Sequence, residues 1–334
     1  SNRIEYPEIH EMNIPLHLLE RKPKKDPRVF YRFYQLCKKI QPDIIHSWGT
    51  MPSVYAVPTT KLLRIKFINA SIADAPLDLD LKHPDYFRGR LTYPFSDVVI
   101  GNSKAGLKAY KAPAGKSICI YNGFDFNRIK HLENKEKIFK QLNIKTEKLV
   151  AMVGGFFERK DYDTYIKAAC QVVAQRNDVS FLAIGDGPDL TRCKNIVEKK
   201  YTDRILFPGM MQNVESIVNA IDIGVLSTNS KVHQEGISNS ILEYMVLGKA
   251  VIASAGGGTD EIVVNGQTGI LIDALNPREL VAALNRLLDD PKLAKEMGAK
   301  GRKRVYEKFT LDRMQEEYLN LYRNLCLTNR QLIS

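Results

Sequence analysis

Two glutamates, Glu235 and Glu243, bracket the segment of this sequence whose residues could do the clearest chemistry. Between them stand Gly236, Ile237, Ser238 and Asn239. Serine and asparagine commonly begin helices, and the first backbone amides of a helix have no partner within it. Such amides attract an anion, while each carboxylate accepts hydrogen bonds from hydroxyl groups. The pattern suits a nucleotide sugar, with amides on its diphosphate and one glutamate each on the hydroxyls of the sugar and of the ribose.

A second candidate segment follows the apolar run 149–153 and reads Gly-Gly-Phe-Phe-Glu-Arg-Lys-Asp. Gly155 permits close approach of the backbone to a ligand, and Arg159 and Lys160 stand just ahead of an expected helix. A diphosphate needs this combination of positive charge and free amides. The alternative interpretation of the two cations is an ordinary exposed pair at the protein surface.

A third candidate segment contains Gly209 and Met210, after the apolar run 205–207. Backbone groups and a flexible thioether at this position could lie against a nucleobase. The alternative for the methionine is packing in the core.

Ten apolar runs of strand length alternate with amphipathic stretches, and these elements must position the candidate residues. The expected strands are 43–46, 66–69, 97–100, 117–120, 149–153, 180–184, 205–207, 223–226, 250–253 and 269–272. The expected helices are 28–40, 161–176, 190–200, 213–220 and 239–247, a charged stretch over 130–145, and an amphipathic region from Pro277 to the end with breaks near Pro291 and Thr310. Continuous apolar strands separated by helices are typical of a parallel sheet with both faces covered. The sequence predicts an α/β protein with two doubly wound, Rossmann-like domains, whose ligands bind at the carboxyl ends of the strands.

The charge of this 334-residue chain is unevenly distributed. Residues 1–145 contain 25 lysines and arginines against 14 acidic residues, whereas residues 146–334 contain 24 of each, so the net charge of +11 comes from the first part. A basic face attracts anionic partners such as phospholipid headgroups, and a merely solvated surface is the alternative. No helix-turn-helix, RNP or zinc-finger pattern is present, so nucleic acid is not an expected partner.

Several other site types are disfavoured by the residue spacing. The six histidines show no metal-binding spacing, and the acidic pairs Asp78/Asp80 and Asp161/Asp163 are interpreted as solvated acids, so no metal site is expected. The five cysteines form no C-x-x-C pair, which favours buried thiols in a reducing compartment. For His46, at the end of an expected strand, core packing and contact with a substrate are equally open.

The stretch 153–273 resembles the donor domain of retaining nucleotide-sugar glycosyltransferases of glycosyltransferase family 4. The resemblance is carried by the E-x7-E element, by Gly-Lys-Ala-Val at 248–251, and by the segments 257–261 and 265–269. Weaker matches lie at 41–47, 97–103 and 122–125. The resemblance implies the GT-B fold, in which two Rossmann-like domains face a cleft. The expected division is an acceptor-side domain over 1–122, a donor domain over 123–310, and a C-terminal helix over 311–334 that packs back toward the first domain.

The resemblance also implies roles for single residues. Glu243 corresponds to the residue that holds the ribose, Glu235 to the one near the hydroxyls of the transferred sugar, and Lys160 to the cation on the diphosphate. Gly155 stands where the family usually has an arginine, and Arg159 is the candidate to reach the same phosphates. The family often has a histidine after the strand 66–69, and Asn69, Ser71 and Asp74 are the hydrogen-bonding groups that stand there instead.

The function implied is retaining transfer of a hexose-type sugar from a UDP or GDP sugar to a glycan or lipid-linked acceptor, in cell-surface polysaccharide synthesis. The family works without a metal or other cofactor. The expected location is the cytoplasm, including the inner face of the cell membrane as a peripheral protein. Neither the family's first strand nor its glycine-rich loop stands before Ile4, so the N-terminus is interpreted as incomplete. The alternative function is therefore a non-catalytic nucleotide-sugar-binding module or an inactive truncated transferase.

Overall fold

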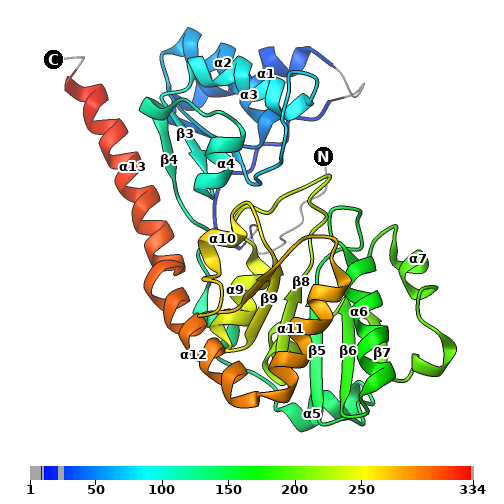
Figure 1. Ribbon diagram of the computed structural model, residues 1–334. Coiled ribbons are helices and arrows are strands. Elements are labelled where there is room, and N and C mark those ends of the chain that lie inside the picture. The colour runs from blue at the N-terminus through cyan, green and yellow to red at the C-terminus, as the bar shows by residue number, and fades with distance from the viewer. Residues whose placement is uncertain (1–8, 10, 22–25, 332–334) are drawn as a thin grey trace.

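Two parallel sheets form the framework of the computed structural model, which describes residues 9, 11–21 and 26–331 (Figure 1). The first sheet contains, in spatial order, β1 (Ile44–Trp48), β2 (Lys66–Ile72), β3 (Val98–Gly101) and β4 (Ser117–Cys119). The second has the order β10-β9-β8-β5-β6-β7, with β5 (Lys148–Val153), β6 (Val179–Ile184), β7 (Ile205–Gly209), β8 (Ile223–Leu226), β9 (Ala250–Ser254) and β10 (Ile270–Ile272). All ten predicted strands are confirmed, and so is the α/β class.

Helices cover both sheets. Those of the first domain are α1 (Arg28–Ile40), α2 (Thr50–Leu63), α3 (Pro84–Thr92) and α4 (Lys104–Ala109). The others are α5 (Lys135–Gln141), α6 (Tyr162–Gln175), α7 (Leu190–Lys194), α8 (Val214–Ala220), α9 (Asn239–Val246), α10 (Thr259–Ile262), α11 (Pro277–Asp289), α12 (Pro291–Lys308) and α13 (Leu311–Gln331). None of the described helices combines the length and the apolar character that a bilayer crossing requires.

Polar caps explain where several helices begin. The Asp161 carboxylate accepts a hydrogen bond from the Thr164 amide at the start of α6, and Asn276 and Asp290 cap α11 and α12 in the same way. Pro291 follows its cap directly, which confirms the predicted break there.

Two helix predictions were too long. The helix expected over 190–200 ends at Lys194, because the chain turns and packs Ile196 and Val197 against the core of the second domain. In the charged stretch 130–145 only α5 is helical, and the Asn134 side chain caps it.

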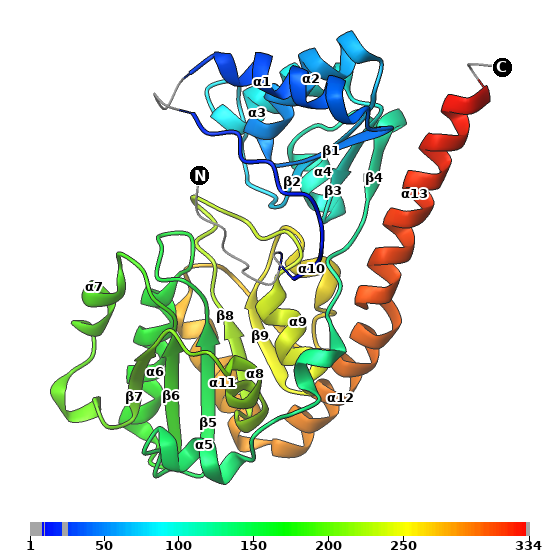
Figure 2. The same ribbon diagram turned by 180° about the vertical axis from the view of Figure 1, so that it is seen from behind.

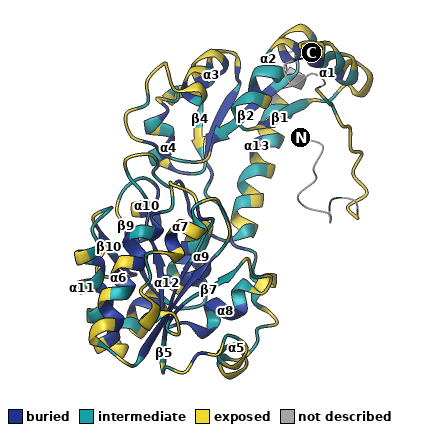
Figure 3. Ribbon diagram, turned by 90° about the vertical axis from the view of Figure 1, so that its right-hand side faces the viewer, coloured by how far each residue is buried: buried dark blue, intermediate teal, exposed yellow. Residues whose placement is uncertain are grey.

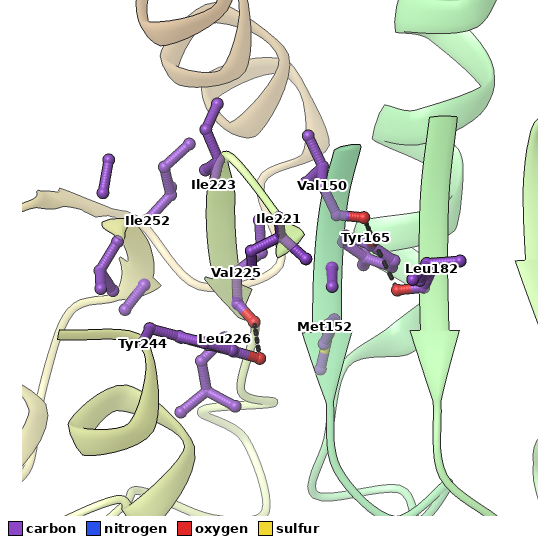
Figure 4. Close-up of a cluster of buried hydrophobic side chains, with 14 of the residues drawn as sticks. Val150, Met152, Tyr165, Leu182, Ile221, Ile223, Val225, Leu226, Tyr244 and Ile252 are labelled. Atoms are coloured by element: carbon purple, nitrogen blue, oxygen red, sulfur yellow. Dashed lines mark hydrogen bonds between the residues drawn. The ribbon is translucent and has the colours of Figure 1, made fainter. Parts of the chain in front are cut away.

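The core of the second domain lies on both faces of its sheet and contains buried tyrosines whose hydroxyl groups are satisfied, among them Tyr165 and Tyr244 (Figures 3 and 4). The Tyr165 hydroxyl lies 2.9 Å from the Leu182 carbonyl, between β5 and β6. The Tyr244 hydroxyl donates to the Val225 carbonyl at 3.3 Å and accepts from the Val153 amide at 2.8 Å. Tyr244 therefore joins α9 to the ends of β5 and β8, where the candidate residues begin.

The chain passes between the domains twice, and the two passages are hydrogen-bonded to each other. The Phe124 amide donates to the Phe309 carbonyl at 2.8 Å, and the Leu311 amide donates to the Phe124 carbonyl at 3.1 Å. Gly123 is required there, since a Cβ atom would lie 2.3 Å from the Thr310 carbonyl oxygen. After this point α13 runs back along the first domain, where Leu321 packs against its sheet (Figures 1 and 2).

The five cysteines carry free thiols. Cys37 and Cys193 are buried as expected, whereas the other three are half-buried.

Replacing Tyr244 with phenylalanine tests this junction. The half-buried Val153 amide would lose its acceptor, so we expect the free energy of unfolding in urea to fall by about 1–3 kcal/mol. Tyr31→Phe is the matched control at an exposed tyrosine, with an expected change below about 0.5 kcal/mol. Equal stability of the Tyr244→Phe variant and the wild type would show that this hydroxyl does not hold the strand ends.

Candidate active site

Lys160 and Glu235 form an ion pair at the carboxyl ends of β5 and β8. The Lys160 ammonium lies 2.6 Å from Glu235 Oε1, and both side chains are only 12% exposed. The Thr228 hydroxyl donates to the same carboxylate oxygen at 3.2 Å. An antiparallel backbone bridge joins Lys160 to Thr228, so the loops that follow the two strands are tied together. Lys160, which is expected to bind the donor diphosphate, and Glu235, which is expected to bind the transferred sugar, are therefore in direct contact.

The Glu235 carboxylate is strongly stabilised in its charged form. Burial raises its pKa, but the neighbouring His233 ring and the Lys160 ammonium outweigh burial and lower the pKa to about 2. Glu235 is therefore an ionised hydrogen-bond acceptor throughout the neutral pH range.

The first domain closes over this ion pair. Asp74, just beyond β2, forms an antiparallel bridge with Glu235, and the Ala75 amide donates to the Gln234 carbonyl at 3.0 Å. Gly236 leaves room for this approach, since a Cβ atom there would lie 2.4 Å from the Ala73 carbonyl oxygen. A cavity of about 460 Å³ lies at the contact, and both domains line it: Gly49, Thr50, Ser71, Ala73, Asp74, Asp85 and Tyr110 from the first, and Arg159, Lys160, His233 and Glu235 from the second.

The start of α9 lies beside the ion pair. Ser238 precedes the helix and is buried, while Asn239, its first residue, is exposed. Asn122, from the first passage between the domains, donates to the Ile237 carbonyl at 3.0 Å. The Ser240 hydroxyl donates to the Val153 carbonyl at 3.0 Å, which fixes the helix start against the end of β5.

Glu243 lies one turn inside α9 and points to a different partner from Glu235. The Arg128 guanidinium donates to Glu243 Oε1 at 2.7 Å and to Glu215 Oε1 at 2.7 Å. Burial raises the pKa of Glu243, and the opposing effect of Arg128 is smaller. Glu243 does not line the cavity that contains Glu235.

Arg128 was not among the residues predicted from the sequence. It lies three residues after the motif at 122–125, in the 3-10 turn Phe126–Ile129. The only signal in the sequence was a cation close to that motif, and nothing in the spacing linked it to a glutamate more than a hundred residues later.

The remaining predicted residues are more dispersed. Arg159 lines the cavity but is exposed, with its guanidinium over the Phe157 ring. Gly155 lies against the same ring, since a Cβ atom would approach it to 2.6 Å. Gly209 and Met210 stand at the end of the edge strand β7 and do not line the cavity. Met210 is 79% exposed, so it does not pack in the core.

The acidic pairs have local roles in the structure. Asp161 caps α6 and Asp163 pairs with Arg192, while Asp80 accepts hydrogen bonds from two amides of its own turn. Within 9, 11–21 and 26–331, no group of three or more His, Cys, Asp or Glu residues is arranged to hold a metal ion.

His46 lies away from the ion pair, in a cluster with α13. Its ring stacks on Trp48 at 4.6 Å between centroids, and Nδ1 lies 2.8 Å from the Tyr322 hydroxyl. Burial lowers the pKa of His46 to about 4, so the ring is neutral at pH 7. Of the two interpretations left open for His46, these contacts support packing.

Comparison with known proteins gives the family. Residues 134–304 match the family model of glycosyl transferases group 1, and residues 1–128 match that of glycosyltransferase family 4. The chain belongs to the group 1 glycosyltransferases. Its two parallel-sheet domains have the GT-B arrangement, and HepE of Anabaena in complex with UDP-glucose superposes with a TM-score of 0.81 at 20% identity, over 95% of this chain and 87% of that one.

Two curated relatives of this group 1 glycosyltransferase indicate its wider context. The N-acetyl-alpha-D-glucosaminyl L-malate synthase of Bacillus anthracis is 26% identical over 61% of this chain. The capsular polysaccharide biosynthesis glycosyltransferase CapM of Staphylococcus aureus is 29% identical over 60% of it. Each alignment takes in 52% of the relative, so the chain spans about half the length of these relatives.

The ionised state of Glu235 makes a prediction about stability and pH. Its folded pKa of about 2 lies below the ordinary 4.5, which corresponds to about 3 kcal/mol at most. This stabilisation is complete above the unfolded pKa and is lost as the pH falls toward the folded pKa. In urea unfolding, the free energy of unfolding of the wild type should therefore exceed that of Glu235→Gln by a constant amount from pH 7 to 5. This difference should shrink below pH 4.5.

Glu158→Gln, at an exposed position on the loop after β5 that carries Lys160, is the control and should show no such pH-dependent difference. A difference between wild type and Glu235→Gln that stays constant down to pH 3 would contradict the ionised, paired carboxylate.

Proposed function

We propose that this chain transfers a hexose-type sugar from a nucleotide-diphosphate sugar to a hydroxyl group of a glycan or lipid-linked acceptor, with retention at the anomeric carbon. The observation that carries the proposal is the Lys160–Glu235 pair, buried at the carboxyl ends of two parallel strands and lining a cavity shared by both domains. Membership of the group 1 family and a relative named for capsular polysaccharide biosynthesis support it. The solved similar structure with UDP-glucose favours a uridine donor.

In this proposal the donor lies along α9. Lys160 and the first amides of α9 bind the diphosphate, because a cation and a helix start together neutralise phosphate charge. Arg159, at the mouth of the cavity, reaches the same phosphates from solvent. Glu235 accepts hydrogen bonds from hydroxyls of the sugar. Glu243 accepts them from the ribose, with Arg128 holding its carboxylate in place.

The reaction follows from this placement. The bond from the anomeric carbon to the diphosphate oxygen breaks, and negative charge develops on that oxygen, where Lys160 stabilises it. The acceptor hydroxyl attacks from the same face, and its proton passes to the departing phosphate. The new bond joins the acceptor oxygen to the anomeric carbon with retained configuration. This route needs neither a protein nucleophile nor, in our proposal, a metal or other cofactor.

The basic first part of the chain is proposed to hold the protein against anionic lipids at the inner, cytoplasmic face of a membrane. Its cations include Lys38 and Lys39 in the last turn of α1. This attraction should weaken as salt is added. Salt screens exposed charges from one another beyond a Debye length, which is roughly 10 Å at 0.1 M salt. Cosedimentation with phosphatidylglycerol vesicles that persists unchanged at 0.5 M salt, or fails at low salt, would contradict it.

A panel of UDP and GDP sugars, measured by calorimetry and then by release of the nucleotide, tests the proposed function. We expect one nucleotide sugar to bind and to be consumed when an acceptor hydroxyl is supplied. Binding without turnover would favour the alternative, a non-catalytic nucleotide-sugar-binding module, while failure of all donors to bind would overturn both.

Glu243→Ala gives the sharper form of this test. Loss of hydrogen bonds between ribose hydroxyls and a charged group should weaken nucleotide binding by about 1–3 kcal/mol. Glu215→Ala is the matched control, because the Glu215 carboxylate accepts a hydrogen bond from the same Arg128 guanidinium. Equal affinities of the Glu243→Ala variant and the wild type would remove Glu243 from the donor site.

A further inference from the structure

His233 lies between a carboxylate of each domain. Its Nδ1 atom is 3.5 Å from Asp74 Oδ2, on the first domain, and its Nε2 atom is 3.8 Å from Glu235 Oε2, on the second. The His233 side chain is only 12% exposed and lines the same cavity as the Lys160–Glu235 pair. The ring is therefore part of the wall of the candidate site.

Hydrogen bonds hold Asp74 on one side of this ring and the backbone of His233 on the other. The Tyr110 hydroxyl, on a buried residue, donates to Asp74 Oδ1 at 2.9 Å and leaves Oδ2 facing His233. On the other side the His233 amide donates to the Asn229 carbonyl at 3.0 Å. Asp74 Oδ2 and Glu235 Oε2 therefore face opposite nitrogens of the ring.

The two atoms on the Glu235 side leave a place for a hydroxyl group. Glu235 Oε1 is already used by Lys160 and Thr228, so Oε2 is the oxygen available to a ligand. The 3.8 Å between Oε2 and His233 Nε2 is longer than a hydrogen bond. A hydroxyl group of a ligand can donate to Oε2 and accept from a protonated Nε2, and so satisfy both atoms.

We propose that His233 is a further residue of the donor site, which binds a hydroxyl of the transferred sugar together with Glu235, and that Asp74 is the positioning residue for its ring. The inference rests on the proposed function, since it assigns the sugar-binding end of that same site. Lys160 stands on the far side of Glu235 from His233, so the diphosphate and the sugar have separate contacts.

This assignment links recognition of the sugar to contact between the domains. Asp74 and His233 belong to different domains, so their pairing requires that the first domain lie against the loop after β8. A nucleotide that lacks the sugar has no hydroxyl group to bind at His233. His233 therefore discriminates between the donor and the nucleotide product.

Calorimetry with UDP and UDP-glucose, or with the nucleotide and nucleotide sugar that the donor panel selects, tests the inference. For His233→Ala we expect the affinity for the nucleotide sugar to fall about tenfold and that for the free nucleotide to change less than about twofold. Lys160→Ala should weaken both ligands. His131→Ala, at an exposed histidine, is the control and should weaken neither.

Two more variants separate a positioning role from a structural one. His233→Gln keeps a hydrogen-bonding side chain, and it replaces His233→Ala in the test if circular dichroism shows that the alanine variant does not fold. For His233→Gln we expect a smaller loss of affinity, again selective for the nucleotide sugar. Asp74→Asn should also weaken the nucleotide sugar selectively, and the double variant with His233→Ala should lose no more than His233→Ala alone.

If His233→Ala lost affinity equally for the nucleotide sugar and the free nucleotide, or lost none for either, the role of His233 would be overturned, while the proposed donor site would stand. Failure of the wild type to bind any nucleotide sugar would instead overturn the proposed function, and this inference with it.

Discussion

The ion pair between Lys160 and Glu235 is the interaction on which the rest of this structure depends. Removing both charges from water costs several kcal/mol for each, and their mutual attraction offsets that cost only where further polar groups complete the site. Thr228 and His233 supply those groups here. The doubly wound sheet places all four at the carboxyl ends of its strands, and the lysine remains within reach of a ligand phosphate because the pair lines a cavity rather than the core.

Polar contacts join the two domains. The Glu261 carboxylate, on α10, accepts hydrogen bonds from the Ala105 amide at 2.8 Å and from the Tyr121 hydroxyl at 2.9 Å. The hydrogen-bonded passages at Phe124 and Phe309 are the covalent links beside them. An interface of this kind permits one domain to move against the other, which a substrate needs in order to enter and leave a site between them.

The sequence predicted the strands well because each is a short apolar run, a pattern that local residues determine alone, and β3, β6, β8 and β9 are buried along their whole length. It predicted the start of α9 from the small and polar residues between the two glutamates, and the structure confirms that helix. It could not predict that Arg128 holds Glu243, that Gly236 admits the first domain, or that Asp74 faces His233. Each of these depends on contacts between residues distant in the chain. The length of α7 was wrong because packing of the residues that follow ended the helix earlier than its composition required.

The most direct test of the central claim is a crystal structure of this chain with the nucleotide sugar that it binds. We expect the diphosphate to lie against Lys160 and the first turn of α9, with the sugar hydroxyls at Glu235. A diphosphate bound elsewhere, such as beside Lys249 at the amino end of β9, with the Lys160–Glu235 pair untouched, would contradict it.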